Sequence, residues 1–344
     1  MNLHGRGATI NPAGRFEKLA VAIDEEFEDP NPRTQYLRDS SQSLITTNDS
    51  PDIGFRASLN PYRGCEHGCS YCYARPYHEY LGFSAGVDFE TRIMVKTDAP
   101  KILRRELSSK KWKPQPLAMS GVTDCYQPVE RKLEITRGCL EVLAEFRNPV
   151  GIVTKNHLVT RDIDFLRELA QFQAASVHIS ITSLDSSLAR RLEPRAASPS
   201  HRLDAIRQLS AAGIPVGVLV APVIPGLNDH EIPAILKAAR EAGALRAGFT
   251  MVRLPYGVKD VFSAWLEEHM PDAKERVLGR IRDMRGGKLN DSTFGSRMRG
   301  EGVFADQIRQ LFAVSLHREG FAERMPGLSI AAFRNPAGEQ LEMF

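Results

Sequence analysis

Three of the five cysteines of the chain lie close together, in the stretch NPYRGCEHGCSYCYARPY (60–77). They are Cys65, Cys69 and Cys72, and their spacing is C-x3-C-x2-C. Three thiolates suit a cubane 4Fe–4S cluster in which one iron atom has no protein ligand. An open coordination position is typical of a catalytic metal site, because structural sites are closed. The spacing therefore favours an iron–sulfur cluster that takes part in chemistry.

A zinc site is the alternative that the same residues leave open. Structural zinc needs four ligands, usually as two separated pairs, and no matching pair follows downstream. His67 and His78 lie nearby, however, so three cysteines and one histidine remain a zinc-binding set.

The residues around the cysteines fit a cluster-binding loop. Gly64 and Gly68 permit the tight backbone that three converging thiolates require. Tyr71 and Tyr73 are placed to shield a cluster from water.

Composition places the chain among ordinary globular proteins. Of its 344 residues 42% are hydrophobic and 25% charged, and the formal net charge of +3 is too small to indicate nucleic-acid binding by itself. No apolar run reaches the length of about 18 residues that a membrane span needs. An odd, clustered set of cysteines does not fit a secreted disulfide framework, and no signal-peptide core is visible at the N-terminus. We therefore expect a cytoplasmic protein with no membrane partner.

Short apolar runs alternate with amphipathic segments between about residues 59 and 252. Strands are predicted at 92–96, 116–121, 150–155, 176–182, 215–223 and 246–253. Helices are predicted at 98–110, 132–147, 162–173, 200–212 and 229–242. This alternation is typical of βαβ units with a parallel sheet, either doubly wound or an incomplete barrel.

Three regions are expected along the chain. Residues 1–58, which include the acidic run 24–29, form an extended, partly ordered arm. Residues 59–255 form the α/β core domain. Residues 256–344 form a helical C-terminal extension with an irregular tail.

The motif C-x3-C-x-aromatic-C, on a loop before a parallel α/β array, resembles the radical S-adenosylmethionine (SAM) superfamily over residues 56–255. The resemblance implies an incomplete (β/α)6 barrel, similar to a TIM barrel, with a 4Fe–4S cluster and SAM as cofactors. It also implies that one electron, from a reductant such as flavodoxin or ferredoxin, cleaves SAM to a 5′-deoxyadenosyl radical. That radical abstracts a substrate hydrogen, and the protein positions and shields the cofactors.

Four further segments resemble the spore photoproduct lyase-like branch, often labelled DNA repair photolyases. They are VTKN (153–156), ISITSLD (179–185), LEPRAASPSHRL (192–203) and GVLVAPVIPG (217–226).

This likeness implies the SAM contacts. Lys155 is expected to reach the methionine carboxylate, and Ser180 the methionine or ribose group. Ala221 is expected against the adenosyl group, and Asp124 at the amino group, with Tyr71 a further cofactor contact. Each strand-end residue occupies the edge at which parallel sheets bind ligands.

Simpler interpretations of these residues stay open. They are a solvated Lys155, a Ser180 that faces a helix, an Asp124 that caps a turn, a Glu193–Arg195 ion pair and an Arg202 on a helix surface.

The chain departs from the lyase pattern at one position. In the lyase a cysteine returns a hydrogen atom to the product radical, and the matching place here is Gly121 or Ser120. Cys125 is either a relocated donor or a buried small hydrophobe, and Tyr126 is a second candidate for radical transfer. Cys139 is expected in the core.

The substrate class stays open at this point. Basic residues gather at 104–114 and 271–300, where they form either a phosphate-binding surface or a solvated helix face and loop. A nucleic acid is one substrate hypothesis, and a radical enzyme that acts on RNA or a peptide is another. A non-catalytic iron–sulfur or zinc protein is the third hypothesis.

Overall fold

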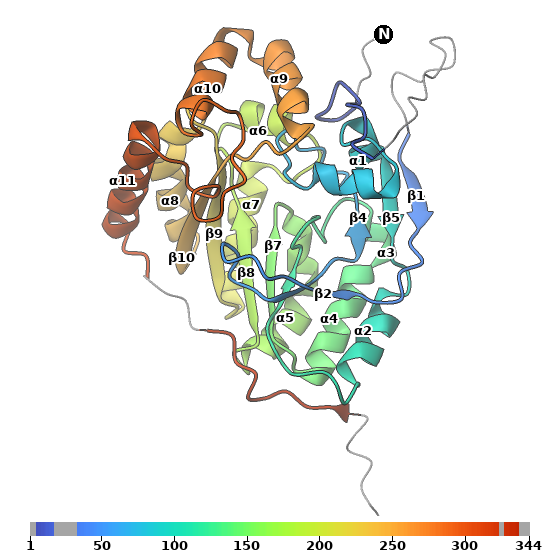
Figure 1. The fold of residues 1–344 in the computed structure, drawn as a ribbon. Coiled ribbons are helices and arrows are strands. Elements are labelled where there is room, and N and C mark those ends of the chain that lie inside the picture. The colour runs from blue at the N-terminus through green and yellow to red at the C-terminus, as the bar shows by residue number, and fades with distance from the viewer. Residues whose placement is uncertain (1–4, 17–32, 323–326, 337–344) are drawn as a thin grey trace, which may run out of the picture.

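A computed structural model describes residues 5–16, 33–322 and 327–336. Its centre is a seven-stranded sheet with the order β10-β9-β8-β7-β6-β3-β2 (Figure 1). The strands are β2 (Ile45–Thr47), β3 (Ala57–Leu59), β6 (Leu117–Met119), β7 (Val150–Thr154), β8 (Ala175–Ser180), β9 (Val216–Val223) and β10 (Arg246–Met251).

Six of these strands, from β3 to β10, run parallel, and β2 joins one edge antiparallel to β3. Strands buried on both faces need apolar residues throughout, and the nearly continuous run VGVLVAPV of β9 is an example. Within the described residues no pairing joins the two edge strands, β10 and β2. The expected incomplete parallel barrel of the (β/α)6 type is confirmed.

One expected strand belongs to a different sheet. Residues 92–96 contain β5 (Arg92–Val95), which pairs parallel with β1 (Gln35–Arg38) and antiparallel with β4 (Tyr62–Arg63). Its place as first strand of the barrel is taken by β3, which pairs with β6. The expectation was wrong here because a three-residue strand is too short to show a period of two, and its partner is distant in sequence.

The helices predicted between the strands all form. They are α2 (Ala99–Leu107), α4 (Ile135–Phe146), α5 (Ile163–Ala170), α7 (Pro199–Ala211) and α8 (Ile232–Glu241). The short segments α1 (Val87–Thr91) and α6 (Ser186–Leu192) and the 3-10 helices η2 (Arg75–Leu81) and η3 (His157–Asp162) were not predicted. The short helices α3 (Glu130–Leu133) and η4 (Asp229–Glu231) overlap the starts of the helices predicted at 132–147 and 229–242. The main core lies between the sheet and the long helices.

The N-terminal arm is described at 5–16 and 33–58, where it contributes β1 and β2; its acidic run, 24–29, lies outside the described residues. The C-terminal extension contains α9 (Val258–His269), α10 (Pro271–Asp283) and α11 (Val303–Arg318). Figure 1 shows α9 and α10 (orange) at the same end of the molecule as α1 and the N-terminal segment. The last residues of the expected tail, 337–344, lie outside the described part.

None of the helices in the described ranges has both the length and the apolarity that crossing a bilayer would require.

Candidate active site

The three cysteines lie on one loop, residues 65–72, which we call the cluster loop. Its first residue is fixed because the Cys65 amide donates to the Phe89 carbonyl oxygen at 2.9 Å. Gly64 and Gly68 have φ angles of +79° and +67°, in the left-handed region where a side chain would be strained. The tight backbone expected from these glycines is confirmed.

The three cysteines of this loop have overlapping surroundings. Cys65 packs with Ala74 and Phe89, Cys69 packs with Tyr71, and the partly exposed Cys72 packs against both groups. None of the three is in a disulfide. The structure thus brings together the three residues that the spacing singled out.

Burial raises the pKa of each of these thiols, and Arg75 opposes it at Cys72. The positive charge of Lys155 also acts on Cys69 and Cys72 and lowers their pKa values, against the larger effect of burial. A metal therefore has to displace protons when it binds. Cationic groups that act on two of the three thiols, Cys69 and Cys72, suit an anionic thiolate-bound cluster.

Within the described ranges no three His, Cys, Asp or Glu side chains are arranged to hold a single metal ion. A cubane cluster does not need such a convergent set, because each thiolate binds a different iron atom. The donor chemistry of the loop fits a 4Fe–4S cluster.

The two histidines of the zinc alternative have different surroundings. His67 has a neighbour at each ring nitrogen, since Nδ1 lies 3.4 Å from an oxygen of Asp124 and Nε2 lies 3.2 Å from the amide nitrogen of Asn156. His78 is buried against Phe83 and Phe89, with ring centroids 5.2 and 5.6 Å apart. His67 would have to give up an existing partner to bind a metal.

Lys155 lies directly after β7. Its ammonium group contacts two of the other residues expected to bind SAM, Ser180 and Ala221. Nζ donates to Ser180 Oγ at 2.6 Å and to the Ala221 carbonyl oxygen at 2.8 Å. It also lies 3.3 Å from Thr182 Oγ1 and 3.2 Å from a carboxylate oxygen of Glu193. A solvated lysine is excluded, because the side chain is only 16% exposed. Lys155, Ser180, Thr182 and Ala221 come from the carboxyl ends of β7, β8 and β9, whereas Glu193 follows α6.

Asp124 follows β6 and connects to the end of β7. Its carboxylate accepts hydrogen bonds from Thr154 Oγ1 and from the Lys155 amide, both at 2.8 Å. It also accepts from the Tyr126 amide at 2.9 Å, so the turn-capping interpretation holds. Asp124 thus aligns the chain at Lys155, and its contact with the SAM amino group stays a prediction.

Glu193 is the site residue whose importance the sequence did not reveal. Its buried carboxylate accepts from the Arg202 guanidinium and the Tyr71 hydroxyl. Thr182 Oγ1 donates to it at 2.5 Å, and Lys155 is its fourth neighbour. Burial acts to raise the pKa of Glu193, but Arg202 and Lys155 outweigh it and hold that pKa far below its ordinary value.

Two of the simpler interpretations, both of which concern arginines, are wrong. Glu193 pairs with Arg202 and not with Arg195, which instead donates to Glu66 in the cluster loop at 2.5 Å. Arg202 is not on a helix surface, because it is only 1% exposed and also donates to the Ser180 carbonyl oxygen at 3.0 Å. A charge this deeply buried requires the partner that Glu193 provides.

The two tyrosines of the cysteine stretch differ. Tyr71 is buried, and the centre of its ring lies 5.8 Å from Lys155 Nζ. Tyr73 is 43% exposed, and its hydroxyl donates to the Gly121 carbonyl oxygen at 3.0 Å, at the end of β6.

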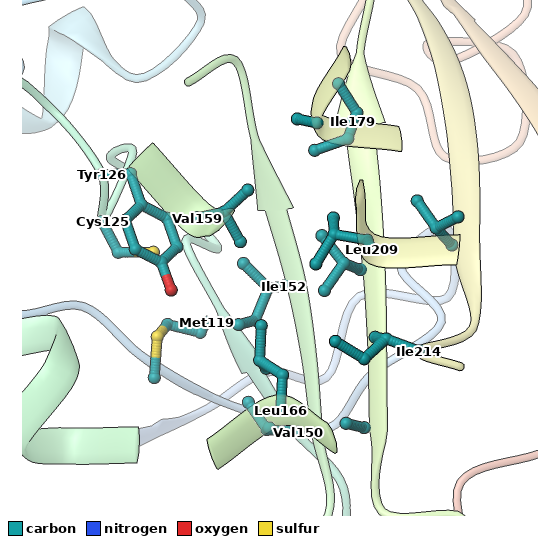
Figure 2. Close-up of a cluster of buried hydrophobic side chains, with 14 of the residues drawn as sticks. Met119, Cys125, Tyr126, Val150, Ile152, Val159, Leu166, Ile179, Leu209 and Ile214 are labelled. Carbon is teal, nitrogen blue, oxygen red and sulfur yellow. The ribbon is translucent and has the colours of Figure 1, made fainter. Parts of the chain in front are cut away.

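Cys125 and Tyr126 lie in the main hydrophobic core, where Figure 2 shows them beside Met119 and Val159. Both are fully buried, and the Tyr126 hydroxyl donates to Asp162 at 3.1 Å. The role of either residue in radical transfer stays a prediction. Cys139 lies in the same core, as expected.

The model of the radical SAM superfamily matches residues 59–239, which is more than half of the chain. The chain therefore belongs to this superfamily, and its cofactors are a 4Fe–4S cluster and SAM.

Individual relatives agree with this family. The chain is 37% identical to an uncharacterized protein of Mycobacterium tuberculosis over 226 residues, which are 65% of this chain. The match spans 66% of that relative, just under two thirds of the relative's length. It is 25% identical to a radical SAM Nalpha-GlyT isomerase of Pseudomonas phage M6 over 50% of this chain and 34% of that protein. A solved structure of spore photoproduct lyase with dinucleoside spore photoproduct shares the fold, with a TM-score of 0.59, 16% identity and coverage of 83% of this chain and 79% of that one.

The burial of His78 makes stability depend on pH. Burial, with Arg75 and Arg92, lowers its pKa from 6.5 to about 4. The unfolded chain therefore takes up a proton between pH 6.5 and 4 that the folded chain does not, so stability falls as the pH falls through this window. We expect His78→Phe, in the metal-free protein, to flatten the dependence of the unfolding free energy on pH by up to about 1.4 kcal/mol per pH unit.

Urea unfolding at pH 7 and pH 5 measures this, and any constant packing cost of the larger ring cancels between the two pH values. His178, whose pKa is also about 4, leaves a smaller dependence in the variant. An unchanged difference between the two pH values would show that His78 is not the titrating group.

Proposed function

We propose that this protein is a radical SAM enzyme whose cluster is held by Cys65, Cys69 and Cys72. The observation that carries the proposal is the contact between the cluster loop and Lys155. Tyr71, which packs with Cys69, has its ring centre 5.8 Å from Lys155 Nζ and donates to Glu193, which lies 3.2 Å from the same Nζ. When bound and reduced, the cluster supplies one electron that cleaves SAM to methionine and a 5′-deoxyadenosyl radical, which then takes a hydrogen atom from the substrate.

The chain's own residues bind and orient SAM in this proposal. An ammonium has three N–H donors, so Lys155 offers the methionine carboxylate a charge-assisted hydrogen bond in exchange for its longest contact, that with Thr182 at 3.3 Å. Glu193 holds the ammonium in place, and Ser180 and the Ala221 carbonyl fix its direction. Because these partners are already set in the protein, SAM meets a pre-organised group rather than a mobile side chain.

Helix α9 supports the exclusion of water that radical chemistry needs. Cys69 and Tyr71 belong to one apolar cluster with Phe262 and Trp265 of this helix, and both aromatic side chains are fully buried. Trp265 also binds α6, since its Nε1 donates to the Arg191 carbonyl oxygen at 2.9 Å. The C-terminal extension therefore packs against the cluster loop at Cys69 and Tyr71.

The ligand assignment predicts the effect of single cysteine substitutions. Cys65→Ala, Cys69→Ala or Cys72→Ala should each abolish stable cluster assembly, because a cubane held by two thiolates has two open irons. Iron and sulfide content after anaerobic reconstitution, with the visible charge-transfer absorption, measures this. Cys139→Ala is the matched control, a buried cysteine outside the loop that should keep full iron content. A fully loaded Cys65, Cys69 or Cys72 variant would contradict the assignment.

Lys155→Ala should weaken SAM binding by about tenfold or more while iron content stays unchanged, since a hydrogen bond to a charged group contributes about 1.5–3 kcal/mol. Glu193 keeps Arg202, Tyr71 and Thr182 as partners in this variant, so the fold should persist. Equilibrium binding of SAM to the reconstituted protein is the measurement, with the exposed Lys237→Ala as control. Loss of iron, or unchanged SAM affinity, would show that Lys155 has another role.

We infer further that the substrate is a nucleic acid. Beside the cluster loop, the half-exposed Tyr73 ring has the Arg253 guanidinium 5.6 Å from its centre. Phe294 is 58% exposed, with the Arg297 guanidinium 4.4 Å from its ring centre. Exposed aromatic rings stack bases, and a neighbouring arginine adds a cation–π contribution. Arg297 is itself held by Asp52 and is 14% exposed, so it supports the Phe294 ring. The segment 284–302 that carries Phe294 joins the end of β10, where Met251 donates to the Met298 carbonyl oxygen at 3.1 Å.

Oligonucleotide binding at two salt concentrations tests this inference. We expect a steep loss of affinity with salt, and a further loss of about tenfold for Phe294→Ala, because stacking on one base contributes about 1–3 kcal/mol. Val314→Ala, which removes a 67% exposed apolar side chain from α11, should bind as the wild type does. Binding that is independent of salt and of Phe294 would favour a peptide substrate.

A further inference from the structure

The N-terminal residues 5–8, which we call the strap, lie on the cluster loop and are held by one carboxylate. Glu90 of α1 is fully buried. Its Oε2 accepts from the backbone amides of Arg6 at 3.1 Å and Gly7 at 2.9 Å, and its Oε1 accepts from the amide of Ala8 at 2.8 Å. Three successive amides around one carboxylate form an anion-binding nest in which the anion belongs to the protein itself.

The same short helix also holds the cluster loop. The Phe89 carbonyl accepts from the Cys65 amide at 2.9 Å. Arg75, fully buried, lies 3.4 Å from Glu90 Oε1 and donates from Nε and Nη2 to the Cys69 carbonyl oxygen at 3.0 and 2.9 Å. Glu90 is therefore connected to the strap directly and to a cluster-loop cysteine through one guanidinium.

The strap and the loop meet at two glycines. A Cβ added to Gly7 would lie 1.7 Å from the Gly68 carbonyl oxygen, a distance that no side chain can occupy. A Cβ added to Gly68 would lie 2.3 Å from Glu90 Oε2 and 2.6 Å from Arg6 Cβ. No space is left between the strap, Glu90 and the segment between Cys65 and Cys69.

The Arg6 side chain makes a second connection to the loop. It donates to the Glu90 carbonyl oxygen, and its Nη2 lies 3.7 Å from a carboxylate oxygen of Glu66. Glu66 is buried inside the cluster loop, where its amide donates to Gln127 and its carboxylate accepts from Arg195. The strap therefore contacts the loop at two residues, Glu66 and Gly68.

From this geometry we propose that Glu90 is a positioning residue for the cluster. Through the strap and Arg75 it fixes the cluster loop in the one backbone conformation in which the three thiolates bind iron, and it keeps that loop covered. The proposal rests on the proposed function in one respect, the assignment of the cluster to this loop.

Two variants test it in the full-length, reconstituted protein. Glu90→Gln keeps the size of the side chain but replaces one acceptor oxygen with an amide group that cannot accept from the strap. Gly7→Ala keeps Glu90 and forces the strap away from Gly68. Gly54→Ala is the matched control in the same N-terminal arm, since its added Cβ would meet no atom within 4 Å.

The measurement is the rate at which iron is lost to a chelator under anaerobic conditions. We expect both variants to lose iron about tenfold faster than wild type, the effect typical of residues that support metal ligands. Gly54→Ala should match wild type. Wild-type rates in both Glu90→Gln and Gly7→Ala would overturn the proposal.

Amide hydrogen exchange of the full-length, metal-free chain separates this proposal from the assignment of the cluster. The amides of Arg6, Gly7, Ala8 and Cys65 should be protected in wild type and lose protection in Glu90→Gln, while amides of β7 and β8 stay protected in a folded variant. Unprotected strap amides in the wild type would overturn the proposal whether or not iron binds. A third outcome is that the wild type binds no iron but its strap amides are protected and lose this protection in Glu90→Gln. This outcome would support the role of Glu90 in holding the loop and reject the cluster assignment.

Discussion

The rest of the site depends on the interactions of one buried carboxylate, that of Glu193. It joins the cluster loop through Tyr71, the end of β7 through Lys155, the end of β8 through Thr182, and α7 through Arg202. Removal of one member of such a buried pair costs about 3–5 kcal/mol, because an uncompensated charge remains in the interior. A site that must exclude water cannot solvate its cations, so it needs this internal anion.

The residues between the cysteines contribute as much to the architecture as the cysteines themselves. In the C-x3-C segment, Glu66 binds Arg195 and the amide of Val129, and His67 contacts Asp124. Gly68 provides the left-handed turn against which the strap packs. A loop without regular secondary structure is thus held by buried carboxylates, Glu66 inside it and Glu90 beside it. These contacts fix the backbone that carries the three thiols.

The sequence predicted the elements whose signal is local. The strands at 150–155, 176–182 and 215–223 are apolar runs with residues in the main core, and the helices between them follow a period near 3.6 residues. The sheet to which residues 92–96 belong could not be predicted, because it depends on pairing with β1, more than fifty residues earlier in the chain. The three-residue strand β3 has no periodicity to detect.

The site shows the same division. The three cysteines proposed as ligands follow from spacing, and Lys155, Ser180 and Ala221 follow from the resemblance. The structure brings these last three together. The importance of Glu193, Arg202 and Glu90 depends on burial, which the sequence does not display for charged residues because such residues are usually solvated. Each of them is recognised only from partners that are distant in the fold.

The measurement that tests the central claim most directly is the formation of 5′-deoxyadenosine. Wild-type protein and the triple Cys65/Cys69/Cys72→Ala variant would be reconstituted with iron and sulfide, reduced with dithionite and incubated with SAM without oxygen. We predict that the wild type forms 5′-deoxyadenosine and that the triple variant forms none. Equal amounts from the two proteins, or none from a wild type that holds a full cluster and binds SAM, would contradict the claim that these three cysteines support radical chemistry.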